Sequence, residues 1–172
     1  RIDLTWDKVK GATGYDVYWS YCNGKNNFNK LANVPKSQKY ADKNLNNKKE
    51  YKYFTVAYKM SGGKKVYLGR TNTVHVAMPY AAKTNVLKVT VNKTKVNLAK
   101  GKTFKITKKV KLENSKKKAL NHLTKKERFI TSNAKVATVS SAGVIKAVRK
   151  GTCTIYVMSE NGVCAKIKVT VK

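Results

Sequence analysis

The sequence predicts an all-β protein made of two tandem β-sandwiches. Short stretches of alternating apolar and polar residues recur about every 8–12 residues with turn residues between them, which is typical of sandwich strands. Val (20 residues) far outnumbers Leu (9), and branched side chains favour strands over helices. No apolar run approaches the roughly 18 residues that a membrane-spanning helix needs, so no membrane insertion is expected.

In residues 1–79 the alternation begins at once. Ile2, Leu4 and Trp6 fall on one face of the first strand. Asn23-Gly24 is a hairpin signal, and Ser61-Gly62-Gly63 turns the chain again. Strands are expected near 2–6, 15–19, 28–34, 39–45, 51–60 and 65–76.

A short linker at 79–85 leads from the domain at 1–79 into a second domain at 80–172. The alternation restarts at residue 87. Residues 113–128 break the rhythm, and we expect a long basic loop there with room for one helical turn. Strands are expected near 87–91, 96–98, 104–110, 129–131, 136–139, 144–148, 152–158 and 163–171.

The first domain carries motifs of a known sandwich family: Leu4-Thr5-Trp6, 11–18, Leu45 with Tyr51, Tyr53 and 57–58. With them it resembles a fibronectin type III domain. The resemblance implies that Leu45 and Tyr51 form a tyrosine corner, in which the hydroxyl bonds back to the upstream backbone. Thr55 departs from the family, which prefers a larger apolar residue there. The family's first strand should precede Arg1, so we expect the chain to be a piece of a longer protein.

The second domain carries another set of motifs in order and at the expected spacing: 89–94, 99–104, 131–139, 143–147 and 150–157. It resembles a bacterial immunoglobulin-like domain of group 2, as in the surface adhesins intimin and invasin. The basic segment 113–128 is longer than the family's usual loop. The tandem order resembles surface and secreted proteins of Gram-positive bacteria, especially gut Firmicutes, which implies an extracellular, secreted or cell-wall location.

The net charge is +30, and 34 of the 38 basic residues are Lys. Lys is a hydrated point charge, whereas Arg gives planar, bidentate recognition, so a Lys-rich surface favours diffuse, salt-sensitive attraction to polyanions. Residues 80–172 hold +20 of this charge. A plain alternative stays open, in which the Lys residues only keep strands soluble and their edges unpaired.

The positive charge concentrates in the segment 113–128. A second basic patch near the Gly151 turn could extend this segment. The candidate polyanion-binding residues are Lys116, Lys117, Lys118, Lys125, Lys126, Arg128, Lys146, Arg149 and Lys150. A solvated loop without a ligand is the alternative. Outward-facing aromatic residues offer a second candidate, a sugar-stacking platform, against ordinary cross-strand packing. The residues considered are Tyr18, Tyr21, Tyr58 and Tyr67.

The sequence gives little support for a catalytic site or a metal site. The two His residues and scattered carboxylates make no metal-ligand pattern, so we expect no metal and no cofactor. A Cys22–His75 pair stays open, although nothing near either residue recommends it. Alternation places Cys153 inside and Cys164 outside the final hairpin, which disfavours a disulfide between them.

These observations predict a non-catalytic, monomeric pair of surface spacer and adhesion modules that bind anionic glycans or cell-wall polymers through Lys-rich faces. The alternative is a pair of accessory modules of a secreted enzyme whose catalytic domain lies elsewhere. No specific nucleic-acid binding is expected, because Arg is scarce and no such motif occurs.

Overall fold

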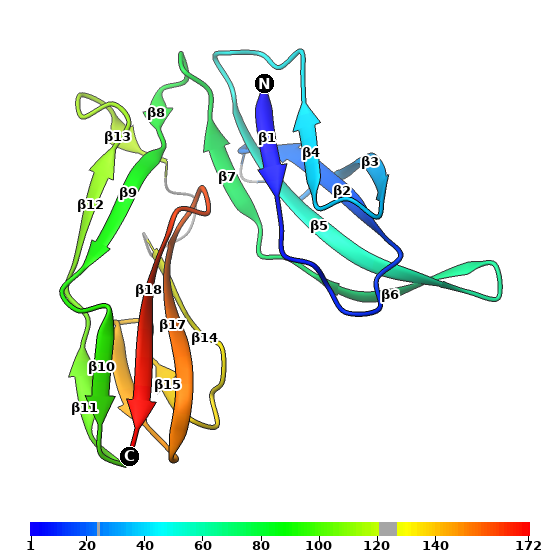
Figure 1. Ribbon diagram of the computed structural model, residues 1–172. Coiled ribbons are helices and arrows are strands. Elements are labelled where there is room, and N and C mark those ends of the chain that lie inside the picture. Colours follow the sequence, from blue (N-terminus) through cyan, green and yellow to red (C-terminus); the bar gives the residue numbers. More distant parts are fainter. Residues whose placement is uncertain (24, 121–126) are drawn as a thin grey trace. The chain divides into compact units, whose positions relative to one another are not determined.

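The computed structural model describes residues 1–23, 25–120 and 127–172, which contain strands and no helix. The chain forms two units, Arg1–Lys83 (unit 1) and Thr84–Lys172 (unit 2), which divide within the predicted linker. Each unit is built from antiparallel hairpins in more than one sheet (Figure 1). The predicted all-β class with two tandem sandwiches is confirmed.

Unit 1 has two sheets. In the smaller sheet β1 (Ile2–Thr5) pairs antiparallel with β4 (Lys39–Asp42). The larger sheet has the order β3-β2-β5-β6, and β7 also pairs with β5. Its strands are β2 (Gly14–Tyr21), β3 (Asn29–Pro35), β5 (Glu50–Ser61), β6 (Lys64–Arg70) and β7 (Val74–Ala77).

The core of unit 1 follows from the alternation of its strands. Ile2 and Leu4 from the small sheet meet Val17, Tyr51 and Tyr53 from the large one, and all five are buried. The backbone N–H of residue 46 donates a 2.9 Å hydrogen bond to the Tyr51 hydroxyl oxygen. This is the bond expected of a tyrosine corner.

The predicted strand at 65–76 is wrong in one respect, because it is interrupted between Arg70 and Val74. At the break Thr71 takes over the pairing with β5. Its backbone N–H donates to the carbonyl of Thr55, and its hydroxyl accepts from the Thr55 N–H. A Thr side chain thus replaces one rung of the ladder.

Unit 2 has two main sheets, of order β10-β18-β17-β14 and β11-β16-β15, and two further strand pairs, β12-β9 and β13-β8. Most pairs are antiparallel, but β10 runs parallel to β18. The strands are β8 (Lys83–Thr84), β9 (Val86–Val91), β10 (Lys95–Leu98), β11 (Thr103–Lys105), β12 (Lys108–Leu112), β13 (Lys118–Ala119), β14 (Glu127–Thr131), β15 (Ala137–Val139), β16 (Val144–Ala147), β17 (Gly151–Ser159) and β18 (Cys164–Val171).

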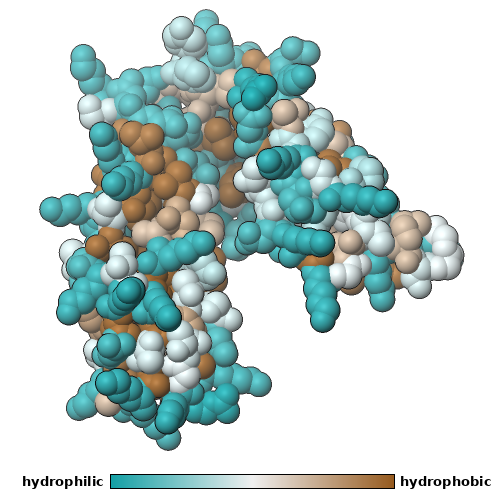
Figure 2. Space-filling model, viewed as in Figure 1, coloured by the Kyte–Doolittle hydropathy of each residue, from teal (hydrophilic) through white to brown (hydrophobic). Residues whose placement is uncertain are grey.

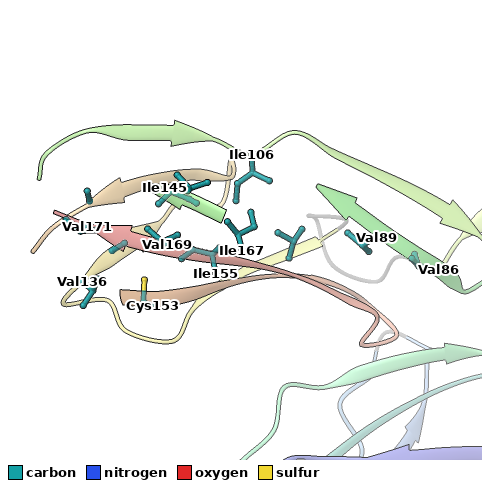
Figure 3. Packing of buried hydrophobic residues seen from close by; sticks show 14 residues of the cluster. Val86, Val89, Ile106, Val136, Ile145, Cys153, Ile155, Ile167, Val169 and Val171 are labelled. Atoms are coloured by element: carbon teal, nitrogen blue, oxygen red, sulfur yellow. The ribbon is translucent and has the colours of Figure 1, made fainter. Parts of the chain in front are cut away.

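The core of unit 2 lies between the two main sheets. Figure 3 shows Ile145 of β16 directed toward Ile155, Ile167 and Val169 of β17 and β18, and all four are fully buried. Cys153 lies in the same core and is 4% exposed. In the final hairpin Cys153 faces Val169 and Cys164 faces Met158, so the two thiols are not opposite each other. Neither is in a disulfide.

Two predictions for unit 2 need correction. The strand expected at 104–110 is two strands with different partners, because β11 pairs with β16 and β12 with β9. Between them Asn92 holds Thr107 through its backbone and side chain. The segment expected as a long loop at 113–128 contains β13 and the start of β14, and its described residues form a turn rather than a helix.

Candidate functional site

Three turns of unit 2 lie together at one end of its sandwich. The turn after β10 is tied to the end of β16, since Gly101 donates to the carbonyl of Ala147 and Ala147 donates to that of Lys102. The turn before β17 is tied to the turn before β15 through two bonds to the carbonyl of Val136. These backbone bonds fix the position of the basic residues in the turns.

We call this group of residues the basic end. All its members are exposed and lie in or beside the three turns: Lys100, Lys102, Lys135, Lys146, Arg149 and Lys150. Lys146, Arg149 and Lys150 were predicted from the sequence. The other three were missed because they are far apart in the chain, although each occupies a turn next to a recognised strand.

The acidic residues of unit 2 lie at the opposite end of the sandwich in this unit. Residues 84–172 contain three acids, Glu113, Glu127 and Glu160. In the backbone pairing Glu127 lies opposite Ser159, the last residue of β17, and Glu160 follows Ser159 in the chain. The basic end adjoins Gly151, the first residue of β17. β17 is about 26 Å long, which is roughly three times the Debye length at physiological salt. The positive field of the basic end is therefore not offset by carboxylates of this unit.

The view coloured by hydropathy is consistent with this. Figure 2 shows hydrophilic side chains projecting from the end of unit 2 where the C-terminus lies. The terminal backbone is part of this end, because the N–H of Lys172 donates to the carbonyl of Leu98.

Lys116, Lys117 and Lys118 lie elsewhere. They follow a turn in which the Asn114 side chain accepts from the backbone N–H of Lys116, and β13 pairs with β8. This places them at the end of the unit that also holds Glu113, whose side chain accepts a 2.9 Å hydrogen bond from Asn85. The predicted residues therefore form two separate groups. Lys125 and Lys126 lie outside the described residues.

Arg128 is largely committed to the fold. Its guanidinium lies 3.3 Å from a carboxylate oxygen of Glu160, and the two side chains are only 17% and 3% exposed. A guanidinium held in this way neutralises a buried carboxylate and does not offer its charge to a polymer in solvent.

A second cationic cluster lies on the outer face of the large sheet of unit 1. Asp16 is fully buried, and Lys30 and Lys65 both reach it at 2.8–2.9 Å. Asn33 donates to the same carboxylate and to the hydroxyl of Tyr58. Burial alone would raise the pKa of Asp16, but the hydrogen bonds from Lys65, Asn33 and Lys30 together hold it below the ordinary value.

The four tyrosines considered for sugar stacking have different environments. Tyr58 is buried, with the Lys65 ammonium 4.0 Å from its ring centroid. Tyr21 and Tyr67 are exposed, at 41% and 57%. Tyr18 is half-buried and stacks on Phe54 with a centroid distance of 4.9 Å.

The structure brings Cys22 and His75 together. The Cys22 sulfur lies 3.3 Å from Nδ1 of His75, where β7 runs beside β5. The contact is partly buried, and sequence reasoning had no signal for it because the residues are 53 positions apart.

Among the described residues no group of three or more His, Cys, Asp or Glu side chains is placed to hold a metal ion. The part of the chain that the structure describes has no helix long and apolar enough to cross a membrane.

The comparison with family models decides the family of unit 2. The model described as "Bacterial Ig-like domain (group 2)" matches residues 85–171, just over half of the chain. The chain belongs to this family. The fibronectin type III resemblance of residues 1–79 stays a prediction. None of the curated proteins compared with this group 2 Ig-like chain matches it.

Solved structures similar to this bacterial Ig-like chain include surface-layer proteins. Domains 1–6 of surface layer protein SbsC are 20% identical with a TM-score of 0.42, over 71% of this chain and 16% of that one. A second SbsC structure, rSbsC(31–844), is 18% identical with a TM-score of 0.42, over 96% of this chain and 21% of that one.

Another is a 282-residue C-terminal fragment of intimin, solved with the intimin-binding domain of the translocated intimin receptor. It is 15% identical with a TM-score of 0.31, over 99% of this chain and 57% of that one. The chain thus spans less than two thirds of each of these solved chains.

Proposed function

We propose that this chain is a non-catalytic module pair of a bacterial surface or secreted protein, and that the basic end of unit 2 binds anionic polymers. The observation that carries the proposal is the gathering of six exposed cations on three hydrogen-bonded turns, away from the unit's carboxylates. The family match supports the bacterial Ig-like character of the module. Spacing and adhesion on the cell surface are the roles that this architecture serves.

The chemistry of the basic end favours a repeating polyanion over a single small ligand. Five of its six cations are Lys, whose ammonium groups attract anions without fixed geometry. Exposed Lys side chains on turns keep their rotational freedom, so each contact is weak and affinity arises from several contacts along one polymer. Wall polymers, sulfated glycans and sialylated mucins all carry the required charge density.

The proposal is tested by calorimetric titration of the chain with heparin at about 50 mM and about 500 mM NaCl, since screening should abolish most of an electrostatic affinity at the higher salt. Purified wall teichoic acid serves as a second probe. We expect saturable binding at low salt that is lost at high salt. If neither polymer binds at low salt, the basic end has no such role.

A matched pair of variants locates the binding. Arg149→Glu with Lys150→Glu reverses two charges at the basic end, and Lys116→Glu with Lys118→Glu makes the same net change at the other end of unit 2. We expect the first pair to weaken heparin binding about tenfold or more and the second to change it little. Equal losses in the two pairs would mean that binding follows total charge and would contradict the assignment to the basic end.

A further inference from the structure

The outer face of the large sheet of unit 1 contains an open hollow of about 600 Å³. Its lining comes from three strands and two loops: Tyr18 of β2, Phe54 of β5, Arg70 at the end of β6, and three loop residues. The loop residues are Asn26, Phe28 and Thr73. The break between β6 and β7 matters here, because it brings Arg70 and Thr73 to the same wall.

Ring contacts hold the aromatic part of the hollow in place. Phe54 stacks on Tyr18 with a centroid distance of 4.9 Å and meets the edge of Phe28 at 4.7 Å. The Arg70 guanidinium carbon lies 3.8 Å from the Phe54 centroid, within cation–π distance. Rings and guanidinium therefore form one interlocked group whose geometry exists before any ligand binds.

Arg70 keeps hydrogen-bonding capacity for a ligand. Nη2 donates to the Thr73 hydroxyl at 2.9 Å, and Nε donates to the carbonyl of Thr71 at 3.4 Å. A guanidinium has five N–H donors, so three are left. The side chain is exposed, and these donors can form the forked pair that matches a carboxylate.

A second cation lies beside the hollow. Lys52 is 5% exposed, and its ammonium donates to the backbone carbonyl of Lys25 and to Oδ1 of Asn26. It also lies 4.8 Å from the Phe28 centroid. The lining itself contains no carboxylate. Two cations next to an acid-free lining make the hollow favourable for an anion.

We propose that this hollow binds a carboxylated pyranose, such as a hexuronic or sialic acid unit of a glycan. Flat aromatic rings accept the C–H face of a sugar ring, the Arg70 fork accepts its carboxylate, and Asn26 and Thr73 bind its hydroxyls. The volume suits one or two sugar units, and the mixture of rings with an amide, a hydroxyl and a guanidinium is typical of a pocket with oriented polar contacts. The site lies in unit 1 and is independent of the basic end.

The test is a titration of the ¹⁵N-labelled chain with sodium D-glucuronate, with D-glucose as the control that lacks only the carboxylate. We expect glucuronate to shift the side-chain signals of Arg70 and Asn26 in a saturable manner, and glucose to bind about tenfold more weakly or not at all. Equal binding of the two sugars, or shifts confined to unit 2, would overturn the proposal without any variant.

Variants then assign the carboxylate contact. Arg70→Gln removes the charge, and Arg70→Lys keeps the charge but not the fork, so both should weaken glucuronate binding roughly tenfold. Arg149→Gln, which removes one charge from the basic end, should leave glucuronate binding unchanged. Unaltered glucuronate affinity in a folded Arg70→Gln chain would refute the site. Binding of wall teichoic acid, a polyol phosphate without hexuronic acid units, should survive in the Arg70 variants, which separates this proposal from the polyanion function of the basic end.

Discussion

The Lys65 ammonium donates to both carboxylate oxygens of Asp16, at 2.8 and 3.0 Å, on the solvent side of the large sheet of unit 1. Asp16 is nevertheless fully buried. It is covered by long side chains from neighbouring strands, among them Lys30, whose ammonium lies 2.9 Å from the same carboxylate. A buried carboxylate that accepts hydrogen bonds from two ammonium groups and one amide stabilises the fold only while it is ionised.

Asp16→Asn should therefore destabilise unit 1 by about 2 kcal/mol at pH 7, because the amide carries no charge and replaces one acceptor oxygen with an NH2 donor. The pKa of Asp16 is below its ordinary value of 3.8, so the folded state binds this proton less readily than the unfolded state. Its contribution is present above about pH 4 and is lost as the pH falls through the folded pKa. Urea unfolding at pH 7 and at pH 2–3 measures both effects.

The matched control is Asp3→Asn, since Asp3 is 59% exposed and pairs with an exposed Arg1. Asp3→Asn should change the free energy of unfolding only slightly at both pH values. A destabilisation by Asp16→Asn that is the same at pH 7 and at low pH would contradict the role of the ionised carboxylate.

Alternation over the strand expected at 15–19 places Tyr15 and Val17 on one face, and both are buried. It also places Asp16 on the outer face, and it cannot show that this face is covered. The covering depends on which residues of β3 lie beside Asp16 and on Lys65 of β6 reaching it across β5, and thus on strand register. Asp16 faces Asn33 of β3 across one ladder, a pairing set by the irregular register of that hairpin.

A second prediction concerns the Tyr51 corner. Tyr51→Phe removes the hydroxyl that accepts the hydrogen bond from the backbone N–H of residue 46. The free energy of unfolding should fall by only about 1 kcal/mol, because this N–H can form a hydrogen bond to water instead. Tyr80→Phe is the control, since Tyr80 is 72% exposed. Thermal unfolding of the two variants measures the difference. Equal unfolding temperatures would show that the corner bond does not stabilise unit 1.

The corner illustrates what local motifs can predict. Leu45 and Tyr51 are six residues apart, and the hydrogen bond joins residues 46 and 51 between them, so the short motif contains the whole feature. The break at Thr71 could not be predicted in this way. Residues 65–76 contain no proline, and the break depends on the Thr71 hydroxyl, which accepts a hydrogen bond from the backbone N–H of Thr55 on β5.

A third prediction follows from the Cys22–His75 contact. Imidazole can accept the thiol proton, so alkylation of Cys22 by iodoacetamide at neutral pH should be faster than that of Cys153, which is 4% exposed. Cys164 should react more slowly than Cys22, because burial raises the pKa of its thiol although Lys166 opposes this. Peptide mass spectrometry over time gives the three rates.

His75→Ala separates the effect of the imidazole from that of exposure. It should slow the alkylation of Cys22 and leave the rate at Cys164 unchanged. If the Cys22 rate does not fall, the 3.3 Å contact does not activate the thiol, and exposure alone sets the order of reaction.

The basic end was half predicted from the sequence. Lys146, Arg149 and Lys150 are close together in the chain, so their clustering is local. Lys100 joins them through the backbone bonds of Gly101 and Lys102 to Ala147, which is 45–46 positions away. Lys135 joins them through the bonds of Val148 and Arg149 to the carbonyl of Val136, which is 12–13 positions away. Charge counting also treated Arg128 as part of a solvent-facing segment, because nothing local shows that Glu160 lies opposite it.

Arg128 supplies the last prediction. Arg128→Gln leaves the 3%-exposed Glu160 carboxylate without its guanidinium and should destabilise unit 2 by about 2–3 kcal/mol. The same variant should bind heparin as the unmodified chain does, since the Arg128 charge is already neutralised by Glu160. Lys150→Gln, with the same loss of one charge on an exposed side chain, should show the reverse pattern of normal stability and weaker heparin binding. Weaker binding with unchanged stability in Arg128→Gln would place this residue among the ligands of the polymer and would contradict its structural role.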